Sequence, residues 1–225
     1  MHFIKLKSQK EAEVYLLQEL KAAVQHYSNV TWLVSGGSNI SLAINAFKQL
    51  DDDMLSSLTI ALVDERYGTA SHVDSNFYQL KSAGLDLSRV NNLPVLTDKG
   101  GSLEETTAEY ANALQKLFNS SDHIIGQFGI GPDGHTAGVL PYSPATQATK
   151  KLVVGYEADD FSRITITLDA IRIVSKALVF AFGENKREAI LNLRDKELSL
   201  NEEPAQIFKQ LDKAYIINDM IGDKL

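Results

Sequence analysis

Short apolar runs alternate with longer amphipathic stretches from one end of the chain to the other. The runs that predict strands are Phe3 to Leu6, Val30 to Val34, Leu58 to Val63, Leu93 to Leu96, His123 to Ile130, Leu152 to Tyr156, Arg163 to Leu168, Ala177 to Phe182 and Ala214 to Ile217. Ile, Val, Leu and Phe fill them without strict alternation, which is typical of strands covered on both faces. Strands that alternate with helices predict an α/β fold, with one doubly wound, mainly parallel sheet and helices on both faces.

The amphipathic stretches begin at recognisable helix starts. Ser8 with Glu11 and Ser102 with Glu105 read as capping boxes, because each pair can satisfy backbone N–H groups that a helix start leaves free. Further helices are expected at Ile40 to Leu50, Ser75 to Ala83, Lys186 to Arg194 and Pro204 to Leu211. No internal repeat, low-complexity tract or linker-like change of composition interrupts the pattern, so we expect a single domain over residues 1–225.

Composition narrows the classes of protein and partner. The chain has no cysteine, which excludes a disulfide framework, a thiolate nucleophile and a cysteine-ligated metal centre. No stretch approaches the ~20 apolar residues that span a bilayer, and the N-terminus lacks the apolar core of a secretory signal. The formal net charge is -7 and no basic cluster stands out, which argues against nucleic acid and membranes as partners. We therefore expect a cytoplasmic protein, in which a small anionic substrate would need a local positive site.

A glycine pair follows one of the apolar strands, where Val30 to Val34 runs into Ser35, Gly36, Gly37 and Ser38. Glycine permits a tight turn and close approach of a ligand, and the free N–H groups at a helix start favour a phosphate. The spacing matches neither the dinucleotide fingerprint nor the Walker phosphate loop. A purely structural turn is therefore an equal alternative.

Three adjacent charged residues, Asp64, Glu65 and Arg66, follow the next predicted strand. Loops at the carboxyl ends of parallel strands line the ligand crevice of open α/β sheets, so this position favours a site role for Arg66. The alternative is a solvated loop in which Asp74 or Ser75 caps the next helix.

The most specific segment is the glycine-rich turn within Phe128 to Gly138, which again follows an apolar strand. Its small neighbours leave the His135 imidazole open to substrate or water, and a group that titrates near neutrality suits a general base. His72 is a weaker rival. A structural or exposed role is expected for His2, His26 and His123. No second histidine has ligand spacing relative to His135 and Asp133, so we expect no metal site.

Two cations lie near strand ends farther along the chain. Arg163 opens one predicted strand, and Lys186 follows the strand from Ala177 to Phe182. Arginine offers a planar fork for phosphate oxygens and lysine a point charge, although ordinary surface cations are the common alternative. No Gly-x-Ser-x-Gly element occurs, so a serine-hydrolase triad has no support.

The order of these motifs resembles the 6-phosphogluconolactonase and glucosamine-6-phosphate isomerase superfamily. The motifs are Ser-Gly-Gly-Ser, Asp-Glu-Arg with Ser-Asn downstream, Gly-x-Gly-x-Asp-Gly-His, Arg-x-Thr and Gly-x-x-Lys. The resemblance spans about Trp32 to Lys186, and its Asp-Gly-His element is distinctive. Arg66 favours the lactonase branch, because the isomerase branch usually has Tyr at that position.

The resemblance implies hydrolysis of 6-phospho-D-glucono-1,5-lactone to 6-phosphogluconate, the second step of the oxidative pentose phosphate pathway, without metal or organic cofactor. By analogy, His135 activates water, and Arg66 orients the sugar acid or stabilises developing negative charge. Asp133 either fixes the turn or orients His135, and Asp64 joins the substrate-binding residues. The phosphate would be held by Gly36, Gly37, Ser38, Arg163 and Lys186.

Some positions depart from the superfamily pattern and bear on the choice of substrate. They are Asn39-Ile40 in place of Thr-Pro, Tyr67-Gly68-Thr69 in place of aromatic-Val-Pro, and Gly138-Val139-Leu140 in place of Ser-Leu-Phe. Two alternatives remain: a sugar-phosphate isomerase or deaminase, and a non-catalytic sugar-phosphate sensor. The isomerase branch has a Glu five residues after the histidine, where this chain has Leu140, and a sensor should carry a DNA-binding helix-turn-helix.

Overall fold

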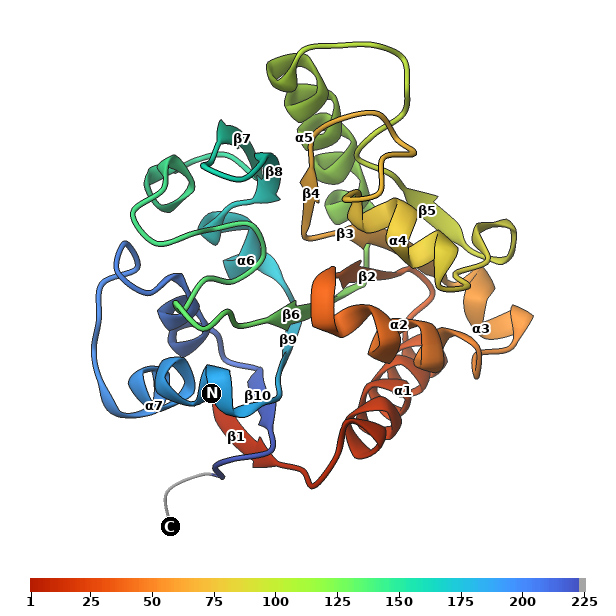
Figure 1. Ribbon diagram of the computed structural model, residues 1–225. Coiled ribbons are helices and arrows are strands. Elements are labelled where there is room, and N and C mark those ends of the chain that lie inside the picture. Colours follow the sequence, from red (N-terminus) through yellow and green to blue (C-terminus); the bar gives the residue numbers. More distant parts are fainter. Residues whose placement is uncertain (223–225) are drawn as a thin grey trace.

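A parallel sheet of seven strands forms the centre of the described chain (Figure 1). The structure is a computed structural model that describes residues 1–222. In spatial order the strands are β1 (His2–Lys5), β10 (Ala214–Asn218), β9 (Lys176–Ala181), β6 (His123–Gly129), β2 (Val30–Val34), β3 (Leu58–Leu62) and β5 (Asn91–Leu93). The prediction of an α/β fold with a mainly parallel sheet is confirmed. Residues 223–225 of the expected single domain lie outside the described residues.

The order of the strands reverses near the middle of the sheet. From β2 the chain continues to β3 and β5 on one side, and then returns to β6, β9 and β10 on the other. The reversal falls between β2 and β6, which pair in register from Val30 opposite His123 to Leu33 opposite Gly126. In open α/β sheets a ligand crevice forms at the carboxyl ends of the strands beside such a reversal.

The central strands are covered on both faces. Every residue of β2 is buried, and so is β6 up to Phe128, as expected for strands covered on both faces, although the buried positions include Thr31, His123 and Gln127. The helices are α1 (Gln9–His26), α2 (Ile40–Phe47), α3 (Asp52–Ser56), α4 (Asn76–Ser82), α5 (Leu103–Ser120), α6 (Leu168–Ile173) and α7 (Arg187–Asp195). Of these, α1 packs on α2 and α2 on α4. Within residues 1–222, none has the length and apolarity needed to traverse a bilayer.

A second, antiparallel sheet contains strands β4 (Asp64–Arg66), β8 (Ser162–Ile166) and β7 (Val153–Glu157) in that order. It lies near α5, at the top of the view in Figure 1, and α5 packs against β7. The apolar runs that start at Leu152 and Arg163 do form strands, but in this small sheet rather than in the parallel one. Asp64 to Arg66, expected as a loop, is a strand because it pairs with β8.

Of the two capping boxes expected from the sequence, one forms completely and the other only in part. Ser102 and Glu105 form a complete capping box, with reciprocal hydrogen bonds of 3.1 and 2.8 Å. Ser8 caps α1, but the Glu11 carboxylate accepts from the backbone N–H of Lys7, so that box is only half formed.

Two further segments were assigned wrongly in type or position. The helix expected from Pro204 to Leu211 is a 3-10 helix over Pro204–Gln210, which we label η5. The strand expected at Leu93 to Leu96 ends at Leu93, because β5 pairs with β3 only from Asn91 to Leu93.

Candidate active site

A pocket of about 210 Å³ opens at the carboxyl ends of β2, β3, β6 and β9, beside the strand reversal. Eight of the nine residues expected in the site line it together: Gly36, Gly37, Ser38, Asp64, Arg66, His135, Arg163 and Lys186. The ninth, Asp133, does not line this pocket but contacts His135 directly. The structure therefore brings together residues that are up to 150 positions apart in the sequence.

His135 and Asp133 form a hydrogen-bonded pair in the turn after β6. The Asp133 Oδ1 atom lies 2.6 Å from His135 Nδ1 and also accepts from the backbone N–H of His135 at 3.2 Å. Partial burial favours the neutral form of Asp133, but the hydrogen bonds and charge of His135 outweigh it and lower the pKa of that carboxyl. An ionised carboxylate can only accept, so in the neutral imidazole Nδ1 carries the proton and Nε2 keeps its lone pair. This is the tautomer that a general base requires.

Gly131 is required for this pair to form. A Cβ atom at position 131 would lie 2.1 Å from His135 Cε1 and 2.6 Å from Asp133 Oδ1. No side chain fits at such distances, so the imidazole packs directly against the backbone. The turn itself is closed by hydrogen bonds from Gly131 N to His135 O and from Gly134 N to Gly131 O.

The loop after β2 is anchored by a buried amide network. Asn39 Nδ2 donates to the Phe128 carbonyl at 3.0 Å, and Gln127 Nε2 donates to the Asn39 carbonyl at 3.1 Å. Residues Gly37–Asn39 form a short 3-10 helix that leads into α2, with Gly37 at φ +61. Lys186 lines the same pocket, and its Nζ donates to Ser38 Oγ at 3.3 Å. The loop thus presents backbone and hydroxyl groups beside a cation, as an anion site needs.

Glu65 has a structural role between two charged neighbours that line the pocket. Its fully buried carboxylate accepts four hydrogen bonds, which join β4 to the start of α4. The donors are the backbone N–H groups of Arg66, Asn76 and Phe77 and the Ser75 hydroxyl. Ser75, rather than Asp74, is the cap of α4, since its Oγ accepts from Tyr78 N.

Asn76 lines the pocket although the sequence analysis did not select it. Its Nδ2 donates to the Asp64 carbonyl at 2.9 Å, and its Oδ1 is buried without a hydrogen-bond partner among residues 1–222. A Cβ atom on Gly36 would lie 2.0 Å from this Oδ1, so Gly36 is needed for the packing of the loop. The Ser75-Asn76 pair, which is among the motifs of the resemblance, was the available signal, but a role was expected only for Ser75, as a possible helix cap.

The charges of the pocket favour an anionic ligand. Its lining contains Arg66, Arg163 and Lys186 against one carboxylate, Asp64. Burial raises the pKa of Asp64, although Arg66, Arg163 and His135 oppose this effect, and burial lowers the pKa of Lys186. The Nε atoms of Arg66 and Arg163 are buried and find no acceptor within the described chain. Unpaired buried donors cost free energy, and an anion supplies the missing acceptor.

Other candidates lie outside this arrangement. His72 is absent from the described pocket lining and its Nε2 lies 2.9 Å from the Arg66 carbonyl, so it supports the loop after β4. No group of three or more His, Cys, Asp or Glu side chains within the part of the chain that the structure describes is arranged to hold a metal ion.

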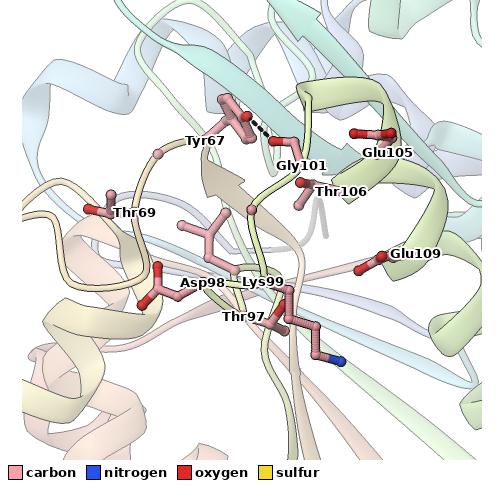
Figure 2. A pocket seen from close by; sticks show the side chains of 12 residues that line it. Tyr67, Thr69, Thr97, Asp98, Lys99, Gly101, Glu105, Thr106 and Glu109 are labelled. Carbon is pink, nitrogen blue, oxygen red and sulfur yellow. Dashed lines mark hydrogen bonds between the residues drawn. The ribbon is translucent and has the colours of Figure 1, made fainter.

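A larger hollow of about 380 Å³ lies beyond Tyr67 (Figure 2). The Tyr67 hydroxyl donates to the Gly101 carbonyl across it, and Asp98, Glu105 and Glu109 give it a negative lining with a single lysine. None of the nine residues expected in the site lines this hollow, although Tyr67, Gly68 and Thr69, which depart from the superfamily pattern, do. Its charge does not suit a phosphorylated ligand, so the smaller pocket is the better candidate.

Comparison with known proteins identifies relatives of the chain. A family model described as glucosamine-6-phosphate isomerases/6-phosphogluconolactonase matches residues 6–216. The 6-phosphogluconolactonase of Nostoc sp. is 30% identical over 188 residues, which cover 78% of this chain and 75% of the relative. A probable 6-phosphogluconolactonase of Arabidopsis thaliana is 30% identical over 212 residues, which cover 83% of this chain and 78% of the relative.

The fold has solved counterparts. The crystal structure of a 6-phosphogluconolactonase from Shewanella baltica matches with a TM-score of 0.83 and 22% identity, and covers 96% of both chains. The structure of 6-phosphogluconolactonase from Trypanosoma brucei matches with a TM-score of 0.74 and 18% identity, over 96% of this chain and 95% of the other. These similarities extend over both sheets and establish the architecture.

Proposed function

Because the chain belongs to the glucosamine-6-phosphate isomerase/6-phosphogluconolactonase family, we propose that its pocket hydrolyses 6-phospho-D-glucono-1,5-lactone to 6-phosphogluconate. The observation that carries this proposal is the Asp133–His135 pair beside a pocket lined by three cations and one carboxylate. A general base next to an anion site suits the attack of water on a phosphorylated lactone.

His135 acts on water in the first step. Its Nε2 accepts a proton as the water oxygen bonds to the lactone carbonyl carbon, and the carbonyl π electrons move to oxygen. Asp133 holds the resulting imidazolium through the Nδ1 hydrogen bond of 2.6 Å. When the ring C–O bond breaks, the leaving oxygen takes the proton back from Nε2. The products are the carboxylic acid, which then ionises, and a free hydroxyl group.

The cations have two tasks in this mechanism. Arg66 stabilises the oxyanion that forms at the carbonyl oxygen, since a fixed cation interacts more strongly with that charge than with the neutral carbonyl. Lys186 and Arg163, with the loop from Gly36 to Ser38, hold the phosphate. Asp64 binds a substrate hydroxyl group.

The isomerase alternative lacks the groups it needs. Aldose–ketose isomerisation with deamination needs a base that moves a proton between adjacent carbons and further groups that open the sugar ring. The segment from Thr136 to Pro141 contains no carboxylate, and Leu140 stands where the isomerase branch has Glu. Leucine cannot transfer a proton, so lactone hydrolysis is the better-supported activity.

The proposal includes partners, cofactor and location. The partner is a small phosphorylated sugar lactone, without nucleic acid, and the reaction needs neither a metal nor an organic cofactor. We place the protein in the cytoplasm, because a charged phosphate ester does not cross a membrane unaided and must share the compartment of its enzyme. Unchanged turnover in excess chelator is the expected result for the metal-free mechanism.

A paired assay tests the choice of reaction. Freshly generated 6-phosphogluconolactone is offered to the protein, and acid release is measured above the uncatalysed rate. Ammonia release from glucosamine 6-phosphate is measured in parallel. We expect rapid lactone hydrolysis and no ammonia. Ammonia release at a comparable rate would transfer the function to the isomerase branch.

A further inference from the structure

Phe161 lies at the tip of the β7–β8 hairpin, next to two guanidinium groups of the pocket. The tip is closed by a hydrogen bond of 3.1 Å from Ala158 N to Phe161 O. The Cζ atoms of Arg66 and Arg163 lie 5.7 and 5.8 Å from the centre of the Phe161 ring. Both distances fall within the ~6 Å at which the negative face of an aromatic ring attracts a cation. Phe161 is absent from the described pocket lining, so its effect on a ligand must pass through the two arginines.

The two arginines need such support because their charges repel each other. Arg66 and Arg163 are directly opposed in the antiparallel pair of β4 and β8, and like charges at opposed positions are destabilising. Arg66 Nη1 donates to the Asp74 carbonyl at 2.9 Å, and Arg163 Nη2 donates to Asp160 Oδ2 at 2.6 Å. Asp160 adjoins Phe161, so one hairpin tip supplies a carboxylate to one arginine and a ring to both.

We propose that Phe161 is a positioning residue that fixes Arg66 and Arg163 as one anion clamp. Each guanidinium is held through one terminal nitrogen, while its Nε has no acceptor among residues 1–222 and keeps donor capacity. A mobile arginine loses rotamer freedom when it binds a ligand, and the ring removes part of that loss in advance. The proposal rests on the proposed function for the identity of the anion, a phosphorylated sugar acid or its lactone.

Two substitutions at Phe161 distinguish the effect of its aromatic ring from the effect of its apolar volume. Phe161→Leu keeps an apolar side chain without the ring, whereas Phe161→Tyr keeps the ring. Phe118→Leu, in α5 and absent from the pocket lining, is the matched control. If the ring orders both arginine side chains in advance, its loss predicts a roughly 5- to 30-fold weaker Kd for 6-phosphogluconate in Phe161→Leu, measured by titration calorimetry. Phe161→Tyr and Phe118→Leu should bind like the wild type.

A double-mutant cycle shows whether the ring acts through the arginines. In an Arg163→Met background, Phe161→Leu should weaken binding by only about half as much on a logarithmic scale, because one of the two contacts is already lost. Fully additive effects would overturn the proposal, and so would a Phe161→Leu variant that binds like the wild type.

A measurement without ligand keeps this test separate from the proposed function. The ring current of Phe161 should displace the Nε–Hε signals of Arg66 and Arg163 in the NMR spectrum, and Phe161→Leu should move both signals selectively. Unmoved signals would overturn the clamp whatever the ligand. A wild-type protein that binds 6-phosphogluconate without hydrolysing the lactone would contradict the proposed function alone. If the wild type does not bind 6-phosphogluconate, the NMR comparison of wild type and Phe161→Leu alone tests whether the ring contacts the two arginines.

Discussion

Two substitutions of Asp133 distinguish the effect of its negative charge from its role in orienting the His135 imidazole. One Asp133 oxygen accepts from both the backbone N–H and Nδ1 of His135, at 3.2 and 2.6 Å. In Asp133→Asn the side-chain carbonyl can accept both hydrogen bonds, so the tautomer is retained while the negative charge is lost. In Asp133→Ala both the acceptor and the charge are lost. The two variants should therefore differ in turnover.

The structure sets the expected magnitudes. A hydrogen bond to a charged group contributes about 1.5–3 kcal/mol and a neutral one about 0.5–1.5 kcal/mol, so the charge is worth about 1 kcal/mol or slightly more. The side chains of His135 and Asp133 are 35% and 51% exposed, and solvent screening favours the low end. We expect kcat to fall about 5-fold in Asp133→Asn and about 10- to 30-fold in Asp133→Ala.

Steady-state lactone hydrolysis, corrected for the uncatalysed reaction, measures kcat for both variants. The Kd for 6-phosphogluconate is the control and should change little, because Asp133 does not line the pocket. An Asp133→Ala protein with wild-type kcat would refute the orienting role. Equal losses in the two variants would show that charge, rather than orientation, is the whole contribution.

Two stability predictions follow from buried groups outside the proposed mechanism. In Glu65→Gln, one carboxylate oxygen is replaced by an NH2 group, so backbone N–H groups that donate to that oxygen in the wild type lose their acceptor. The free energy of unfolding, measured in urea, should fall by about 2–4 kcal/mol. Wild-type stability would contradict the capping role. Burial lowers the pKa of His123, and the positive charges of Lys176 and Lys213 lower it further. The folded chain therefore binds this proton less readily than the unfolded chain does. Stability should therefore fall as the pH drops below about 6.5, the unfolded pKa of histidine. His123→Phe, which keeps the stack on Tyr27, should show a smaller loss between pH 7.5 and 5.5 in urea titrations, and an equal loss would contradict the assignment.

The parallel sheet could be predicted because its signals are local. Val30 to Val34 is apolar except at Thr31, and Ile124, Ile125 and Phe128 give His123 to Phe128 an apolar pattern without strict alternation, which is typical of strands covered on both faces. The glycine-rich turns that follow them place Gly36 and His135 at one edge of the sheet by topology alone. A shared site for Gly36, Gly37, Ser38 and His135 could therefore be proposed without coordinates.

The small sheet could not be predicted because its pairing is not local. Asp64 pairs with Thr165, about a hundred positions away, and no pattern within Asp64 to Arg66 distinguishes a strand from a solvated charged loop. Glu65 is buried only because the start of α4 supplies its donors. The same reason hid Asn76, whose amide bonds to Asp64 once β4 and α4 are in contact.

The central claim is that His135 activates water at an anion site that binds substrate without its help. The most direct test compares His135→Gln with the wild type in two measurements on the same preparations, namely kcat for fresh lactone and Kd for 6-phosphogluconate. We predict a fall in kcat of roughly 10²- to 10⁴-fold, with a Kd within about 3-fold of the wild-type value. A His135→Gln protein that retains full turnover would contradict the account.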